Sequence, residues 1–203
     1  MNVHTTIIVA YNKDRGWLSQ ALKSAYSQPN CLVVESCSEM TVGHNINVIL
    51  EHVTTPYWCL LDEDDLLTED SVANRVFTIE QTGADFVHAR AVNLWDTGEK
   101  TPYTLTNPHT TFDTCLNRNG IFGSSCLYRT SLRDKFGLWD AELWTGEELE
   151  WHLRILKGGA KIAFCDAVVY EYRRHLSQKS LGIGVDQMAR KKAINEIKLK
   201  YAK

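Results

Sequence analysis

Short, largely apolar runs recur along the first half of the chain and predict buried β-strands. They lie at residues 5–10, 31–34, 57–61 and 84–89, and the first of them is rich in β-branched side chains. A run of that composition is typical of a strand covered on both faces. We therefore expect residues 5–10 to form a strand buried on both faces and the other runs to form further strands of the sheet.

Between these runs the apolar positions recur every three or four residues, which predicts amphipathic helices. Strands that alternate with helices in this way are typical of βαβ units. The predicted fold is therefore a single α/β domain with a mainly parallel central sheet flanked by helices. The helical positions are Leu18, Ala21, Leu22 and Ala25, then Ile46, Ile49, Leu50 and Val53, and finally Val72, Val76 and Ile79.

The pattern is looser in the second half of the chain. Residues 95–120 are polar and contain glycine and proline, so we predict loops or a lid there. Regular patterning returns at residues 122–128 and continues in a helix that carries Leu149, Leu153 and Leu156. Two short strands are predicted at 160–165 and 167–172, and a lysine-rich helix at 187–203.

Composition and charge exclude several classes of protein. The chain has 203 residues, of which 44% are hydrophobic and 23% charged, which suits one soluble domain. The net charge of −3 gives no general attraction to nucleic acid or to anionic membranes. No secretory leader is visible, and no apolar run approaches the roughly 20 residues of a spanning helix. We therefore expect a cytoplasmic protein without stable membrane insertion, and its six cysteines to be free thiols.

Four consecutive acids, residues 62–65, follow the third predicted strand. Adjacent carboxylates repel one another unless a cation is present, and the carboxyl ends of parallel strands form the ligand crevice of such sheets. Asp62 and Asp64, two residues apart, can therefore share a divalent cation that also holds a diphosphate. The alternative is a solvated loop in which Asp65 caps the next helix.

A second acidic group opens the helix around residue 150. Glu147, Glu148 and Glu150 lie in its first turn, where the helix dipole favours negative charge, and this alone explains them. Glu148 nevertheless shares a helix face with Trp151. A carboxylate held beside an aromatic wall has a raised pKa, which suits a general base.

A basic cluster near residue 175 provides the third group of candidates. Arg173, Arg174 and His175 are followed by two serines, and arginines and hydroxyls suit a diphosphate leaving group. His175 could also supply a neutral metal ligand. The alternative is a solvated surface loop.

The order of these segments resembles that of the family 2 glycosyltransferases with the GT-A fold. The resemblance spans about residues 5–180 and is weakest at 95–120. It implies a nucleotide-sugar-binding half at about 1–94, an acceptor half with the catalytic base at about 95–180, and a helical tail at 181–203. The segments that carry it are Val9-Ala10-Tyr11-Asn12, Gly43-His44-Asn45, Leu61-Asp62-Glu63-Asp64-Asp65, Gly137-Leu138-Trp139-Asp140, Gly146-Glu147-Glu148, Leu153-Arg154 and Tyr172-Arg173-Arg174-His175.

The resemblance also implies roles for individual residues in an inverting transfer of a hexose or pentose that depends on Mn²⁺ or Mg²⁺. Asp62 and Asp64 match the Asp-x-Asp metal motif, with His175 as a further metal ligand. Glu148 matches the base that deprotonates the acceptor hydroxyl. The residues expected to contact the nucleotide-sugar donor are Ala10, Tyr11, Asn12, Glu35, Ser36, Asn45, Asp62, Glu63, Arg154 and Arg174.

The sequence departs from the family pattern at two places. Glu35 and Ser36 stand where the family has a pair of aspartates at the end of the second strand, which affects recognition of the base. Glu148 stands in place of an aspartate and is one methylene longer, which shifts its reach by more than an ångström, about one bond length.

Two other functions stay open from the sequence. One is a non-catalytic module that binds nucleotide sugars. The other is a nucleotidyltransferase of related fold, which would normally show a glycine-rich phosphate loop after the first strand, where this chain has one glycine, Gly16. The acceptor is a hydroxyl of a saccharide, a lipid-linked saccharide or a modified nucleic acid. The lysines of the C-terminal helix are either a solvated face or a contact to an anionic surface.

Overall fold

We describe the protein from a computed structural model, which places residues 3–118, 120–178 and 186–202. The end of the basic segment at 179–180 and the first residues of the predicted tail lie outside these ranges. The strands are β1 (Thr5–Tyr11), β2 (Cys31–Cys37), β3 (Tyr57–Leu60), β4 (Leu66–Leu67), β5 (Phe86–Trp95), β6 (Lys100–Pro102), β7 (Leu127–Arg129) and β8 (Ile162–Arg174). The helices are α1 (Leu18–Tyr26), α2 (Val42–Leu50), α3 (Ser71–Thr82), α4 (Phe112–Arg118), α5 (Ser131–Phe136), α6 (Glu147–Lys157) and α7 (Gln187–Tyr201), with a 3-10 turn, η1, at Gly123–Ser125.

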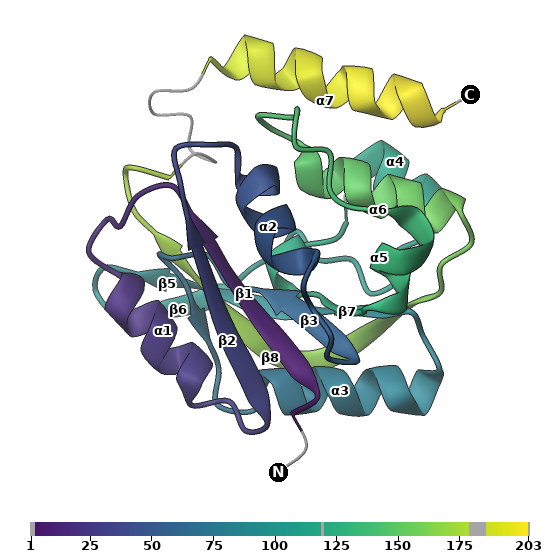
Figure 1. Cartoon of the computed structure of the whole chain (residues 1–203). Helices are drawn as coiled ribbons and strands as arrows, with labels where there is room; N and C mark the ends of the chain where they lie inside the picture. Colours follow the sequence, from purple (N-terminus) through teal and green to yellow (C-terminus); the bar gives the residue numbers. More distant parts are fainter. Residues whose placement is uncertain (1–2, 119, 179–185, 203) are drawn as a thin grey trace.

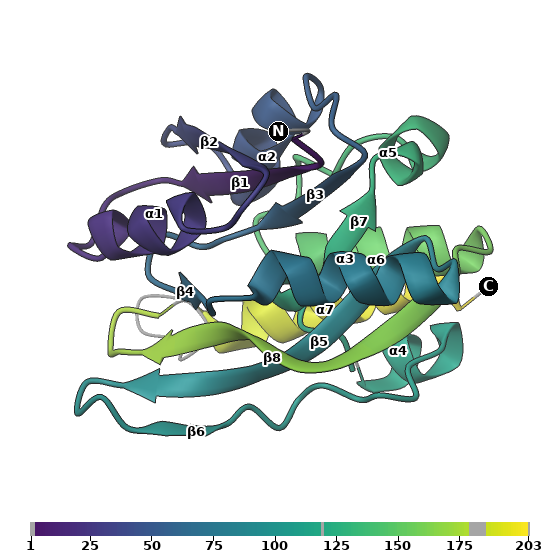
Figure 2. The ribbon, with the colours of Figure 1, turned by 90° about the horizontal axis from the view of Figure 1, so that it is seen from below.

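The strands form one mixed sheet in the order β2-β1-β3-β7-β5-β8-β4, with β6 added beside β5. β1 is parallel to β2 and β3, and β5 is parallel to β8. The predicted α/β fold is confirmed and the longest strand pairings are parallel, but the sheet is mixed, because β7 runs antiparallel to both β3 and β5, and β4 and β6 also pair antiparallel. The sheet curls as it passes from β3 through β7 to β5 (Figure 2).

Helices cover both faces of this sheet (Figures 1 and 2). The alternation of side chains along β1 sends Ile7 and Val9 to the face covered by α1 and α3, and Ile8 and Ala10 to the face covered by α2 and α6. All four are buried, which is why the middle of β1 is apolar on both faces. The sequence prediction of a strand covered on both faces is confirmed here.

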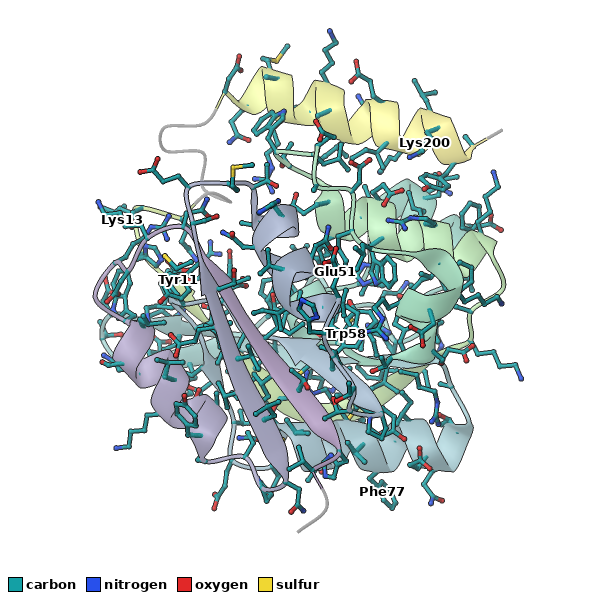
Figure 3. The ribbon with its side chains drawn as sticks, in the orientation of Figure 1. Tyr11, Lys13, Glu51, Trp58, Phe77 and Lys200 are labelled. Carbon is teal, nitrogen blue, oxygen red and sulfur yellow. The ribbon has the colours of Figure 1, made fainter. Side chains whose placement is uncertain are left out.

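Large aromatic side chains fill the layer between the sheet and α6. Trp58 of β3 stacks on Tyr128 of β7 with ring centroids 4.3 Å apart, and Trp151 of α6 packs against both. Figure 3 shows Trp58 inside the protein, whereas Phe77 on the outer side of α3 points away from it. These contacts bind α6, and with it the candidate base, firmly to the sheet.

Two regions of the second half differ from their predictions. Residues 95–120, expected as loops, contain β6 and α4. The two late strands expected at 160–165 and 167–172 are one strand, β8, whose pairing with β5 is interrupted by an irregularity opposite Arg90. Asp166 lies at this irregularity and pairs with Arg90, so the polar residue marks a bulge rather than the end of a strand.

The C-terminal helix α7 lies alongside α6 and also contacts α4, on the outside of the domain (Figure 1). Ile197 is buried and belongs to the core on the α6 side, with Ile194 and Tyr201 packed beside it. Among the described residues, no helix is both long and apolar enough to span a bilayer.

Candidate active site

A cavity of about 500 Å³ opens at the carboxyl ends of β1 and β3. These two strands are parallel neighbours, so the segments that follow them meet at one edge of the sheet. The cavity brings together seven of the predicted site residues, namely Ala10, Tyr11, Asn12, Asp62, Glu63, Asp64 and Glu148.

Asp62 and Asp64 each have separate polar partners. Asp62 Oδ2 accepts hydrogen bonds from the Ser124 hydroxyl at 2.8 Å and from the Tyr170 hydroxyl at 3.3 Å. Asp64 Oδ2 lies 2.8 Å from His175 Nε2. Both carboxylates line the same cavity, as the two-residue spacing predicts.

The other two acids of residues 62–65, Glu63 and Asp65, hold this loop in place. Glu63 is buried and forms an ion pair with Arg15. Asp65 is fully buried, and its Oδ1 accepts a hydrogen bond at 2.7 Å from the backbone N–H of Arg173 in β8. The Arg173 side chain then returns to the loop, where its Nε donates to the backbone oxygen of Asp64 at 2.7 Å. The loop of residues 62–65, the acid loop, is therefore held against β8 by hydrogen bonds in both directions.

The acid run carries more negative charge than the described residues around it neutralise. Burial, and then repulsion from Asp64, raises the pKa of Asp62 to about 6. Burial raises the pKa of Glu63 to about 7 despite its contact with Arg15. Keeping carboxyl groups ionised in this arrangement costs free energy, and a bound cation would lower that cost.

The donor set at this site fits a divalent metal that is shared with a substrate. In the described part of the chain, no three His, Cys, Asp or Glu side chains converge to hold a metal ion by themselves. Mg²⁺ and similar hard cations are commonly held by one or two carboxylates together with phosphate oxygens, and Asp62 and Asp64 can supply those carboxylates. Both ring nitrogens of His175 have partners, Asp64 Oδ2 and the Ser177 hydroxyl at 2.7 Å. His175 would therefore exchange a hydrogen bond to become a ligand.

Glu148 lies in the first turn of α6 and faces the cavity. Its Oε1 accepts a hydrogen bond from the backbone N–H of Gly123. Burial, and then the charges of Asp62 and Glu147, raise the pKa of Glu148 to about 8, although the Gly123 hydrogen bond opposes this. A carboxylate with such a pKa is a strong enough base to accept a proton near neutral pH.

The turn η1 joins Glu148 to the acid loop. Gly123 contacts Glu148, and the next residue, Ser124, donates to Asp62. A Cβ atom at position 123 would overlap the Glu148 carboxyl group, so the absence of a side chain at Gly123 leaves room for that carboxyl group where it lies.

If Glu148 serves as a base, replacing Gly123 by alanine is expected to lower the rate of the reaction it serves by about 10²-fold, since a small misplacement of a reacting group has that effect. The obstructing atoms belong to the flexible Glu148 side chain, which can move aside. We therefore expect the melting temperature to change little. A melting temperature that falls in parallel with activity would show that the residue acts on folding instead.

Three predicted donor residues lie beside the cavity rather than on its wall. Glu35 is exposed and accepts a hydrogen bond from the Tyr11 hydroxyl at 3.4 Å. Ser36 follows it in β2, where it is paired with Ala10. Asn45 is fully buried and donates to the backbone oxygen of Tyr11 at 3.1 Å. Asn45 therefore holds the backbone at Tyr11, at the end of β1, in position, and Glu35 contacts the same residue through its hydroxyl.

The two predicted arginines do not line the cavity. Arg154 pairs with Glu150 at 2.7 Å and donates to the backbone oxygen of Phe136 at 2.7 Å, so it ties α6 to the end of α5. Arg174 lies over the ring of Tyr172. Neighbouring residues of a strand point to opposite faces, and it is Arg173 that turns toward the acid loop.

Several cavity residues gave no signal in the sequence. Ser124, Trp144 and Arg190 line the cavity from η1, from the loop before α6 and from α7. Arg15, which also lines the cavity, and Tyr170, which donates a hydrogen bond to Asp62, had no sequence feature that set them apart from other loop and strand residues. Only their positions in the folded chain bring them to the site.

Comparison with known proteins bears on the family and the fold of the chain. A sequence profile described as "Glycosyltransferase like family 2" matches residues 1–192. The chain is similar in structure to residues 1–349 of S. aureus TarS in complex with UDP-GlcNAc, with a TM-score of 0.74 and 14% identity over 96% of this chain and 65% of that one. The TarS complex with UDP gives a TM-score of 0.68 and 15% identity over 96% of this chain and 70% of that one.

These similarities have clear bounds. The chain spans about two thirds of those TarS fragments and 43% of a longer TarS structure, for which the TM-score is 0.65. At 14–16% identity, the likeness to TarS concerns the fold. No curated protein sequence matches the chain.

Proposed function

The chain belongs to glycosyltransferase family 2, and from that premise we propose that it moves a sugar from a nucleoside-diphosphate sugar to an acceptor hydroxyl by an inverting, metal-dependent reaction. The observation that carries the proposal is the shared cavity of Asp62, Asp64 and Glu148, which are far apart in sequence. It places the two carboxylates suited to a metal–diphosphate complex beside one carboxylate suited to take a proton.

The donor side of the proposed site lies between β1 and the acid loop. Ala10, Tyr11 and Asn12 line the cavity where the nucleoside would lie, and residues 39–42 form the facing wall. The GT-A-like fold of TarS, which has been crystallised with UDP and with UDP-GlcNAc, supports a nucleotide-sugar donor for this chain. We propose that residues up to about 94 bind the donor and that those from about 95 onward shape the acceptor side.

The proposed chemistry is a single displacement. Glu148 takes the proton of the acceptor hydroxyl, and the acceptor oxygen forms a bond to the anomeric carbon. The bond from that carbon to the diphosphate oxygen breaks at the same time, and the nucleoside diphosphate departs with the electron pair. Attack opposite the leaving group inverts the configuration of the sugar. The raised pKa of Glu148 makes it a better proton acceptor than an ordinary glutamate.

The chain's own residues hold the leaving group in this proposal. Asp62 and Asp64 would hold Mn²⁺ or Mg²⁺, which supplies positive charge against the diphosphate when bound. Arg173 and Asp65 keep the acid loop in place, and Ser124 orients the Asp62 carboxylate. His175 holds Asp64 from the other side.

Nucleoside diphosphates are expected to raise the melting temperature of the protein in the presence of Mn²⁺. At a ligand concentration 100 times the dissociation constant, the stabilisation is about 2.7 kcal/mol, or roughly 5–10 °C for a chain of this size. The measurement is a thermal-shift series with UDP, ADP, GDP and CDP, each with Mn²⁺ or with EDTA. If no nucleotide shifts the melting temperature in either condition, the proposed function is wrong. Release of free sugar from the matching nucleotide sugar would separate an enzyme from a binding module.

A further inference from the structure

A second, smaller hollow of about 190 Å³ lies next to the main cavity. Glu148 and Arg190 line both spaces, so the two hollows meet at the proposed base. The acid loop lines the first space and is absent from the wall of the second. The second hollow therefore adjoins Glu148 at a distance from the proposed metal and diphosphate.

The two walls of this hollow carry opposite charges. One wall is the start of α6, with Glu147 and Glu148. The other is α7, which contributes Arg190, Ile194 and Lys198. These three residues are spaced by four, so they share one face of the helix. A molecule in the hollow would meet carboxylates on one side and cations on the other.

The α7 wall is fixed to the helix that carries the base. Tyr201 donates a hydrogen bond to Glu150 of α6, and Lys200 pairs with the same carboxylate at 3.3 Å. Ile197 packs so closely that a Cβ atom at Gly146 would lie 2.7 Å from its Cδ1 atom. Lys198 Nζ donates to the backbone oxygen of Asn117 in α4 at 3.0 Å. These contacts hold Lys198 and the end of α7 in a set position relative to α6.

The charge of α7 favours an anionic partner in solution over a membrane surface. The helix Gln187–Tyr201 carries five cationic side chains and one acid, Glu196. A helix that lies in a membrane interface needs a continuous exposed apolar face. Ile194 and Ile197 are turned toward the protein. The exposed apolar residues Met188 and Leu199 are separated by about three helical turns that carry lysines and other polar residues. What α7 presents beside the hollow is positive charge.

We propose that the hollow between α6 and α7 is the acceptor subsite and that the acceptor carries a negative charge near the hydroxyl that is glycosylated. The hydroxyl lies at Glu148, and the anionic group, a phosphodiester or a carboxylate, is held by Arg190 and Lys198. Arginine binds either group through two parallel hydrogen bonds, and lysine adds a point charge. This inference rests on the proposed function, because it assigns Glu148 to the acceptor.

The test measures the binding of three probes to the whole protein with UDP and Mn²⁺ present. The probes are a short single-stranded oligonucleotide, a short polygalacturonate and a neutral maltooligosaccharide, each measured at low and high salt. We expect at least one of the charged probes to bind and the neutral probe to bind far more weakly. Lys198→Gln, which removes a cation found only in the second hollow, should weaken binding about tenfold through loss of one charge-assisted hydrogen bond. Arg190→Gln should weaken it at least as much.

Lys192→Gln is the matched control, because it removes the same charge from the same helix. Lys192 is exposed and two residues from Arg190, which places it on another side of α7, where it approaches Glu196 at 3.9 Å. It should change the affinity by less than about twofold. Equal losses for Lys192→Gln and Lys198→Gln, equally tight binding of the neutral probe, or binding of none of the probes would overturn the inference. The charged probe that binds identifies the source of the charge. The UDP thermal shift is read separately, so failure of the donor site is distinguishable.

Discussion

Replacing Glu148 by glutamine is expected to lower the rate of sugar transfer by about 10²–10⁴-fold, which is the usual contribution of a general base. The amide keeps nearly the same size and can still accept the hydrogen bond from the Gly123 backbone N–H, but it cannot take a proton. Nucleotide binding should therefore stay close to that of the wild type. The measurement is turnover with the donor, alongside the UDP-induced thermal shift. A variant that retains full turnover would show that another group serves as the base.

The same substitution should stabilise the protein at high pH. The pKa of Glu148 is about 8 in the folded protein and about 4.3 in an unfolded chain. Between these values the folded state binds the extra proton, so the free energy of unfolding falls as pH rises through this window. Glutamine lacks this penalty. We expect equal melting temperatures near pH 4.5 and an advantage for Glu148→Gln on the order of 2 kcal/mol, or several degrees, by pH 8. An advantage that does not depend on pH would contradict the proposed burial of the carboxylate.

Replacing Asp64 by asparagine is expected to abolish the effect of Mn²⁺ on nucleotide binding and to lower turnover by at least about 10²-fold. The amide removes one negative charge from the set that would hold the cation, and neutral amides are weaker ligands for it. The measurement is the UDP thermal shift with Mn²⁺ and with EDTA. Wild type should show a difference between the two conditions, and Asp64→Asn should show little or none.

Asp70→Asn is the control for this experiment. Asp70 is exposed, follows the acid run closely in sequence and makes no side-chain cap to α3. The same chemical change there should leave the Mn²⁺ effect intact. If Asp64→Asn keeps a full response to Mn²⁺, Asp64 is not a metal ligand, and the cation, if used, is held by Asp62 without it.

The parts of the fold that could be predicted from sequence are those that depend on local pattern. β1 and β3 were predictable because a strand covered on both faces is apolar or β-branched along most of its length. The place of the acid run was predictable from the same pattern, since residues that follow parallel strands meet at one edge. Strand partners were not predictable in this way. β7 has three residues, and nothing in Leu127–Arg129 says that it pairs antiparallel with both β3 and β5.

The same distinction between local pattern and contacts between distant segments applies to the candidate site. The sequence by itself determined which groups could do the chemistry, because the acid run and Glu148 stand out by residue type and by position in their elements. Only the tertiary structure decided that Arg173 rather than Arg174 clamps the acid loop, that Arg154 is engaged with Glu150, and that α7 forms a wall of the site. The pKa of Glu148 is set by burial and by charges from other segments. Local pattern records which face a residue occupies, but burial and charge partners depend on distant segments that meet only when the chain folds.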